Sequence, residues 1–353
     1  MQQSFVSRGA ISNLSYILEK TKPAKIILFH GKHSFAKHEG SILPLLSNTK
    51  FDAYSNISPN TKHEEVVLAL KKFNAQDYDM VVAVGGGSVI DFAKSYKHYS
   101  ESEMPLVAIP TTAGTGSEAT QFAVVYINGK KHSLDKPNIL PNFAIVDSQL
   151  LDGAPQYLKA CTALDAYCQA IESFWAVDST IKSRDLAVDA ITLINDSIED
   201  FVLTNSAVAA DQMANAAFIS GQAINISRTT AAHALSYAIT TKYNIPHGHA
   251  VALSIPDLFA ANINITEETC QDPRGYTYVR NNMGVLLDLL KINKSNVAAF
   301  FYSLYDKLGI EWRFSKLGII DRHYLQQAID MTRLANNPKN ISEDLPLFWS
   351  RDN

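Results

Sequence analysis

The sequence predicts an α/β N-terminal domain built on a mostly parallel sheet, followed by an all-α C-terminal domain. Two observations carry this prediction. Over the first 155 or so residues, short apolar runs alternate with stretches of helical periodicity, a pattern typical of a parallel sheet covered by helices. After Pro155 the chain becomes rich in Ala, Leu and Ile at helical spacing, with few β-branched runs bounded by turns.

The expected elements of the first domain follow from their residue types. Buried strands are expected at residues 25–31, 80–84, 106–110 and 143–147, and a helix is expected at 64–73. Typical helical stretches of the second half are residues 187–194 and 282–290. A turn at 152–155 separates the two expected domains, which we assign to residues 1–155 and 156–353.

Composition narrows the classes of function. A chain of 353 residues exceeds the usual size of one core, and 46% hydrophobic with 19% charged residues is a globular balance. The net charge of −4 and the absence of long Lys or Arg runs argue against nucleic acid as a partner. The start has no secretory signal and no stretch is long and apolar enough for a membrane span. Its cysteines are too few for a disulfide framework, and we therefore expect a cytoplasmic protein. We also expect a small-molecule substrate and a homodimeric state.

Two loops rich in small residues follow expected strands. Residues 85–88, Gly-Gly-Gly-Ser, open a helix, where free N–H groups and the helix dipole favour a phosphate. Residues 110–118 follow the next strand and present several hydroxyl groups. Glycines used only for a tight turn, and threonines used only as helix caps, are the structural alternatives. Because two such loops would lie at the ends of neighbouring parallel strands, together they favour a bound dinucleotide.

Three residues of the second half have the chemistry of metal ligands. His233 lies in a helical run, His247 follows Pro246 at an expected helix start, and Asp165 lies in a helix too apolar to bury an unpaired carboxylate. A histidine on an apolar helix is often an ordinary core residue, so each ring alone is weak evidence. One carboxylate and two imidazoles with an open position nevertheless make a catalytic Lewis-acid site.

The order of these motifs resembles the iron-containing (group III) alcohol dehydrogenase superfamily, which includes zinc glycerol dehydrogenases and dehydroquinate synthases. The resemblance spans most of the chain and includes Asp91 and Lys94 after the glycine loop, then Asp165, His233 and His247. It implies an N-terminal dinucleotide-binding domain, a helical metal-binding domain and interconversion of an alcohol with an aldehyde or ketone. It also implies cofactor contacts at Gly86, Gly87, Ser88, Thr111, Thr112, Lys131 and Asn60.

Three departures from the family pattern refine this expectation. The iron-dependent members have a histidine four residues after the aspartate, where this chain has Gln169, which leaves Gln169 as a fourth ligand or as a hydrogen-bond donor behind the ligands. Three protein ligands favour zinc over iron. Tyr237 replaces a histidine beside the substrate and is a candidate to orient or relay a proton. Residues 30–33, His-Gly-Lys-His, lack the acidic residue that holds the ribose of NAD, so NADP is also expected as a cofactor.

The substrate is less well defined. The resemblance favours a hydroxylated or anionic substrate, in the manner of the 3-deoxy-octulosonate 8-oxidase-like branch (a sugar acid oxidised at its C8 alcohol) or the phosphonoacetaldehyde reductase-like branch. Arg228 and Lys242 are candidates to hold an anion, or are solvated surface charges. A glycerol-type dehydrogenase, a dehydroquinate-synthase-like cyclase and a non-catalytic nucleotide-binding protein are the alternatives; Asp165 argues against the cyclase, whose first ligand would be Glu.

Overall fold

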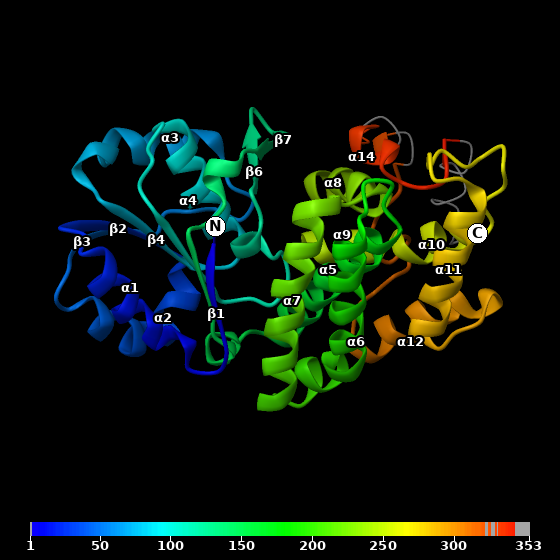
Figure 1. Ribbon diagram of the computed structural model, residues 1–353, viewed down its shortest axis with the longest axis horizontal. Helices are drawn as coiled ribbons and strands as arrows, with labels where there is room; N and C mark the ends of the chain where they lie inside the picture. Colours follow the sequence, from blue (N-terminus) through cyan, green and yellow to red (C-terminus); the bar gives the residue numbers. More distant parts are fainter. Residues whose placement is uncertain (1, 322–323, 326–328, 330, 343–353) are drawn as a thin grey trace. The chain divides into compact units, whose positions relative to one another are not determined.

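The computed structural model describes residues 2–321, 324–325, 329 and 331–342, and has the expected fold class (Figure 1). The chain forms two compact units. The first comprises Met1–Ala154 with Ala210–Gly221, and the second comprises Pro155–Ala209 with Gln222–Asn353. The boundary after residue 154 follows the predicted turn, whereas the sequence does not reveal that a helical segment at 210–221 belongs with the first unit.

A six-stranded parallel sheet forms the centre of the first unit. Its strands lie in the order β1-β8-β5-β4-β2-β3. The four predicted strands are present, and the sheet has two further strands at its edges, β1 and β3. Both are short, and β3 is half exposed, so neither has the continuous apolar run of a central strand. The bounds are β1 (Gln3–Val6), β2 (Lys25–His30), β3 (Lys50–Tyr54), β4 (Met80–Gly85), β5 (Leu106–Pro110) and β8 (Phe143–Val146).

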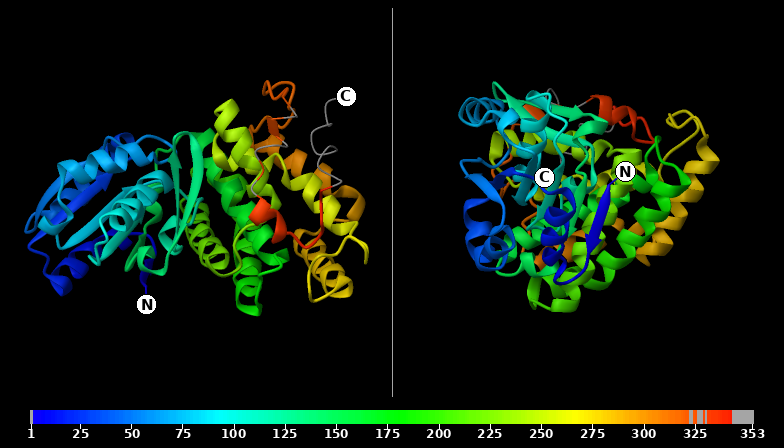
Figure 2. Two further views of the ribbon diagram at one scale, coloured as in Figure 1. Left: turned by 90° about the horizontal axis from the view of Figure 1, so that it is seen from above. Right: turned by 60° about the vertical axis from the view of Figure 1, so that its left-hand side comes forward.

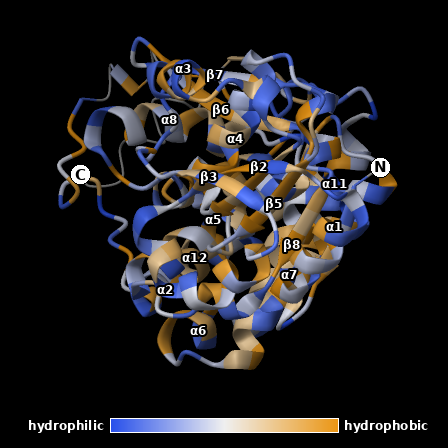
Figure 3. Cartoon of the chain, turned by 90° about the vertical axis from the view of Figure 1, so that its left-hand side faces the viewer, coloured by the Kyte–Doolittle hydropathy of each residue, from blue (hydrophilic) through white to orange (hydrophobic). Residues whose placement is uncertain are grey.

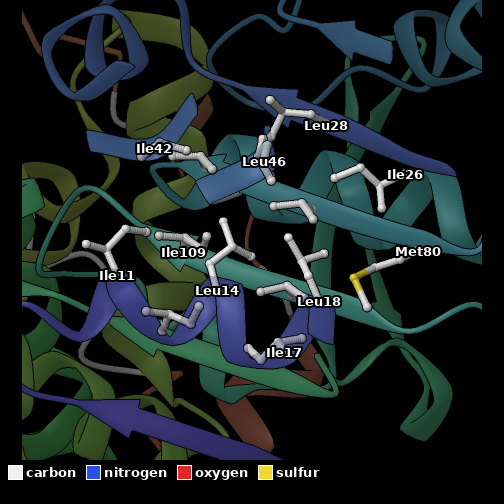
Figure 4. Close-up of a cluster of buried hydrophobic side chains, with 14 of the residues drawn as sticks. Ile11, Leu14, Ile17, Leu18, Ile26, Leu28, Ile42, Leu46, Met80 and Ile109 are labelled. Atoms are coloured by element: carbon white, nitrogen blue, oxygen red, sulfur yellow. The ribbon is translucent and has the colours of Figure 1, made fainter. Parts of the chain in front are cut away.

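Helices cover both faces of this sheet. One face packs against α1 (Asn13–Thr21) and α2 (Lys32–Ile42), in a cluster of buried aliphatic side chains shown in Figure 4. The other face packs against α3 (His63–Lys72) and α4 (Gly87–Tyr99). The strands are coloured as strongly hydrophobic in Figure 3, which fits a sheet buried on both faces.

The strand order places a switch point between β2 and β4. The chain runs from β2 outward to β3 and then returns to the other side of β2 to form β4. In open α/β sheets, ligands bind outside the carboxyl ends of the strands at such a point. The glycine loop follows β4 there, and the threonine loop follows its neighbour β5.

An antiparallel hairpin, β6 (Phe122–Ile127) and β7 (Lys130–Asp135), packs against α3 and α4. The segment 210–221 joins the same unit through close backbone contact. A Cβ atom on Gly221 would lie 2.8 Å from the Cα of Gly116, so both positions require glycine. Asp211 adds an ion pair with Arg8 at 3.1 Å and a hydrogen bond from Ser148.

The second unit is helical over its described residues, as predicted (Figures 1 and 2). Helix α5 packs along α6 and against α9, and α8 also contacts α9. None of the described helices combines the length and apolar character needed to cross a membrane. The helices of the second half of the chain are α5 (Gln156–Trp175), α6 (Ile181–Leu203), α7 (Ala207–Ser227), α8 (Ala231–Tyr243), α9 (His247–Ala252), α10 (Ile255–Ile263), α11 (Tyr276–Leu290), α12 (Val297–Leu308) and α14 (Met331–Ala335). Of these, α7 has its residues 210–221 in the first unit.

Candidate active site

Helix α5 carries an unusual set of buried polar residues. Asp165, Gln169 and Glu172 are 2%, 3% and 0% exposed, although the helix around them is apolar. Their spacing of four and then three residues places them on one face of the helix. Buried carboxylates need a partner, because burial without one costs several kcal/mol.

The structure brings Asp165, His233 and His247 together. One potential ligand atom from each lies within 4.8 Å of the others. The Nε2 atom of His233 is 3.4 Å from Oδ1 of Asp165, and the Nε2 atom of His247 is 3.9 Å from the same oxygen. These residues come from three helices, α5, α8 and α9, and are up to 82 positions apart in the sequence.

Two atoms of this cluster are buried without a hydrogen-bond partner. They are Oδ1 of Asp165 and Nε2 of His233. Such orphaned polar atoms are rare in folded proteins, and the binding of an ion is one recognised reason for them. A divalent cation between the carboxylate and the two imidazoles would satisfy both, so the donor set fits a metal of the zinc or iron type.

The close approach of α9 to α5 depends on Gly248. A Cβ atom there would lie 2.0 Å from the carbonyl oxygen of Cys161 and 2.8 Å from Cβ of Asp165. No larger residue fits without moving one helix. Gly248 therefore lets the neighbouring His247 reach Asp165.

The charges of the cluster favour ionised groups. Burial alone would raise the pKa of Asp165, but the neighbouring His233 and His247 rings and a hydrogen bond from Gln169 hold it below its ordinary value. Burial would lower the pKa of His233, but the charges of Glu172 and Asp165 outweigh it and raise the pKa to about 9. The site is thus arranged to stabilise positive charge beside two carboxylates.

Glu172 is a functional candidate that the sequence analysis missed. One carboxylate oxygen is bonded to Nδ1 of His233. The other accepts hydrogen bonds from the hydroxyl of Thr230 at 2.7 Å and the backbone N–H of Ala232 at 2.7 Å. The sequence could have indicated Glu172, because this carboxylate lies two helical turns after Asp165 on the same apolar helix.

This contact determines which nitrogen of His233 faces the cluster. A histidine that binds a metal through one nitrogen usually donates its other N–H to a carboxylate or carbonyl. Since Glu172 takes Nδ1, Nε2 is left to face Asp165. Glu172 therefore orients the ring and also caps the start of α8.

Gln169 and Tyr237 lie beside these residues. The Gln169 side chain is hydrogen-bonded to Asp165, which is the donor alternative that the sequence left open. Tyr237 is 8% exposed, and its ring is stacked on that of His247, with centroids 5.6 Å apart and planes at 4°.

His249 lies two residues after His247 but is engaged elsewhere. The hydroxyl of Tyr157 is 2.8 Å from its Nδ1, and its Nε2 is 2.7 Å from the carbonyl oxygen of Glu311. Both ring nitrogens thus have protein partners. Of the two neighbouring histidines, His247 is the one whose Nε2 atom lies beside Asp165.

The predicted nucleotide contacts of the first unit gather around the start of α4. Gly86 caps that helix, and Gly87 and Ser88 are its first residues. The backbone N–H of Asn60 donates to Oγ of Ser88 at 3.2 Å, although these residues are 28 positions apart. These four predicted contact residues therefore lie close together in the structure.

The threonine loop lies against the same helix start. The N–H of Thr111 donates to the carbonyl of Gly85 at 3.0 Å, and a Cβ on Gly86 would lie 3.4 Å from the hydroxyl of Thr112. Lys131 is connected to this region only through other residues. It pairs with Tyr126 across the β6–β7 hairpin, and the N–H of Tyr126 donates to the carbonyl of Thr61 at 2.8 Å.

A buried lysine fastens the threonine loop to α4. Lys94 is fully buried and donates to Oγ of Ser117 at 2.9 Å and to the carbonyl of Phe122 at 2.6 Å. Asp91 accepts from the Ser117 hydroxyl at 2.6 Å and from the N–H of Val124 at 2.9 Å. The Asp91 and Lys94 pair of the sequence motif is therefore a support for the loop.

Comparison with known proteins identifies the family. The family described as "Iron-containing alcohol dehydrogenase" matches residues 2–148, and "Fe-containing alcohol dehydrogenase family, C-terminal" matches residues 159–345. Phosphonoacetaldehyde reductase of Streptomyces viridochromogenes is 29% identical over 311 residues, which cover 80% of this chain and 78% of that protein. The probable alcohol dehydrogenase EutG of Escherichia coli is 29% identical over 300 residues, 79% of this chain and 73% of that protein.

Solved structures share the fold. The archaeal halo-thermophilic Red Sea brine pool alcohol dehydrogenase superimposes with a TM-score of 0.87 at 22% identity, covering 99% of this chain and 96% of that one. A 1,3-propanediol oxidoreductase superimposes with a TM-score of 0.84 at 24% identity, covering 98% and 96%. The matches favour a dehydrogenase over the cyclase and the non-catalytic alternatives. The chain therefore belongs to the iron-containing alcohol dehydrogenase family and is an enzyme that interconverts alcohols with aldehydes or ketones.

Proposed function

We propose that this enzyme uses NAD(P)H and one divalent metal, held by Asp165, His233 and His247, to reduce a short aldehyde that carries an anionic group. The observation that supports the metal site is the pair of buried, unpartnered atoms, Oδ1 of Asp165 and Nε2 of His233, beside a second imidazole. When bound, the metal would supply a Lewis acid that polarises the substrate carbonyl. When bound, NAD(P)H would supply the hydride for the carbonyl carbon, and with a proton on the oxygen the products would be an alcohol and NAD(P)⁺.

Three further residues position the proposed metal ligands or move a proton. Glu172 fixes the His233 ring, Gln169 donates to Asp165, and Tyr237 lies on the His247 ring with a hydroxyl suited to relay the proton. We infer zinc rather than iron, because three ligands and an open position suit zinc, and an amide is a weak ligand beside imidazole. Gln169 acts in this proposal as a donor and not as a fourth ligand.

For the nucleotide, we propose that the start of α4 holds the pyrophosphate. Gly86, Gly87 and Ser88 present backbone N–H groups there, flanked by Thr111 and Thr112 and by Asn60 and Lys131. Residues 1–155 then serve as the dinucleotide-binding domain and 156–353 as the metal- and substrate-binding domain. The first turn of α2 after β2 holds no acidic residue and begins with the exposed Lys32, which supports use of NADP as well as NAD.

The substrate class rests on a relative. A phosphonoacetaldehyde reductase aligns with four fifths of this chain, and its substrate is a two-carbon aldehyde with an anionic head. We therefore favour a short anionic aldehyde over the C8 alcohol of 3-deoxy-octulosonate and over glycerol.

The test is a paired measurement of metal and turnover. Elemental analysis of purified enzyme is expected to give about one zinc per chain, and NADH or NADPH oxidation is expected with phosphonoacetaldehyde in preference to propanal. Oxidation of the two alternative substrates, glycerol and 3-deoxy-octulosonate, is measured with NAD⁺ or NADP⁺ for comparison. Full activity after complete removal of metal would refute the proposed mechanism, and preference for the sugar acid would refute the proposed substrate.

A further inference from the structure

Helix α14 brings a cation close to the metal-ligand cluster of the second unit. It packs against α8, the helix of His233 and Tyr237, although it begins 88 positions after α8 ends (Figure 1). The guanidinium carbon of Arg333 lies 5.8 Å from the centroid of the Tyr237 ring. That ring is in turn stacked on His247 at 5.6 Å. Arg333 and a proposed metal ligand therefore contact the same aromatic ring.

The segment that carries Arg333 is firmly held. The side chain of Asn336 donates to the carbonyl of Ser227 at 2.8 Å and to that of Thr229 at 3.1 Å. Asn337 is fully buried and exchanges two hydrogen bonds with Asn262, at 2.9 and 3.2 Å. These contacts tie residues 336–337 to the turn before α8 and to α10.

The guanidinium itself is oriented by the same turn. Its Nη1 donates to the hydroxyl of Thr229, a residue that is 2% exposed and lies directly before the Thr230 that bonds Glu172. One continuous chain of contacts thus runs from Arg333 to His233. Arginine held in this way, half-buried and with its plane set by a hydrogen bond, is the residue suited to bidentate recognition of carboxylate or phosphonate oxygens.

The two cations that the sequence singled out are less suited to this role. Lys242 is nine residues after His233 on α8, roughly 13 Å along the helix axis. Its ammonium group is paired with Asp321 and lies 4.3 Å from the Tyr324 ring. Arg228 is exposed and follows the end of α7 rather than lying on α8 or α14.

We propose that Arg333, oriented by Thr229, is the residue that binds the anionic head of the substrate and selects charged aldehydes over neutral ones. The distances fit a short molecule: the Arg333 guanidinium and the His247 ring both lie against the Tyr237 ring, 5.8 and 5.6 Å from its centroid, so only a short substrate is needed to reach from the ligand cluster to Arg333. This proposal rests on the anionic substrate of the proposed function.

The experiment compares one charged and one neutral substrate in matched variants. For Arg333→Gln, the KM for phosphonoacetaldehyde is expected to rise roughly 30-fold or more, because the anionic head of the substrate loses its charged hydrogen-bonding partner. The kcat/KM for propanal is expected to stay within about twofold of wild type, since no head group is bound. Ethylphosphonate, which cannot be reduced, should lose its competitive inhibition in parallel. Lys242→Gln serves as the control cation and should change neither substrate.

The outcomes distinguish the role of Arg333 from the proposed anionic substrate on which that role rests. If the wild-type enzyme does not prefer phosphonoacetaldehyde to propanal, the anionic substrate is wrong, whatever Arg333 does. If it does prefer it, but Arg333→Gln reduces both substrates equally or neither, Arg333 is not the head-group residue. Arg333→Lys, which keeps the charge but loses the fork, is expected to give an intermediate KM for the phosphonate and applies the same criterion should the glutamine variant not fold.

Discussion

The carboxylate of Glu172 is bonded to Nδ1 of His233, and the Nε2 atom of the same ring lies 3.4 Å from Asp165. Removal of this support should loosen the metal site without removing a ligand. For Glu172→Gln we expect metal affinity to fall by roughly 10- to 100-fold, the range typical for partners of metal-binding histidines. Competition with a chelator measures it. Glu199→Gln, which breaks an exposed ion pair with Lys307, is the matched control; equal loss in both variants would contradict a positioning role.

Two neighbouring histidines should behave differently. His247→Ala is expected to lose the metal and to reduce turnover by at least roughly 100-fold, because positioning and charge stabilisation fail together. His249→Asn removes bonds to Tyr157 and to the Glu311 carbonyl, so it should lower the unfolding temperature and leave metal content unchanged. Retention of metal in the His247 variant would overturn the ligand set.

The variant Gly86→Ala tests whether the start of α4 binds the nucleotide. A Cβ there would lie 3.4 Å from Thr112, a tight contact that small shifts can relieve, so Gly86→Ala should fold normally. It should still weaken NADH binding by roughly 10-fold or more, because a pyrophosphate approaching the backbone would meet the methyl group. Binding is followed by fluorescence titration, with metal content as the control. Unchanged affinity would mean that the loop is purely structural.

Gln169→His restores the residue that iron-dependent relatives have at this position. We expect tighter metal binding and a shift of preference toward iron, because an imidazole is a better ligand than an amide. The variant also removes the hydrogen bond from Gln169 to Asp165. Metal competition assays with Zn²⁺ and Fe²⁺ measure both effects. Unchanged affinity and preference would mean that a histidine at residue 169 does not reach the metal.

Glu118 makes stability depend on pH in a defined window. Burial raises its pKa to about 7 in the folded protein, against about 4.5 for the ordinary side chain. Between these values the folded state holds a proton that the unfolded state has released, so this group makes stability fall as pH rises. Lys94, with a pKa lowered by burial to about 8, stays charged over this range.

Glu118→Gln removes this titration. From pH 4.5 to pH 7, the wild-type protein is expected to lose on the order of 2 kcal/mol more unfolding free energy than the variant. Urea titrations at both pH values measure the difference. Parallel pH profiles of the two proteins would contradict a buried, protonated Glu118.

The sequence by itself determined the alternation of central strands and helices, the turn near residue 154 and the helical second half. These follow from local periodicity and turn residues, which act over a few positions. It also indicated Asp165, His233 and His247, since a carboxylate in an apolar helix needs a partner. The sequence did not predict the edge strands β1 and β3, because a strand that is short or half exposed needs no continuous apolar run.

Only the tertiary structure decided which of these residues meet. It separated His247 from His249 by giving the latter two protein partners, and it bonded Glu172 to a ring 61 residues away. It brought residues 210–221 into the first unit through the contact of Gly116 with Gly221, and it set Arg333 against Tyr237 in place of Lys242. Such contacts depend on how helices pack, and no local pattern encodes them because each joins side chains or backbones that are distant along the chain.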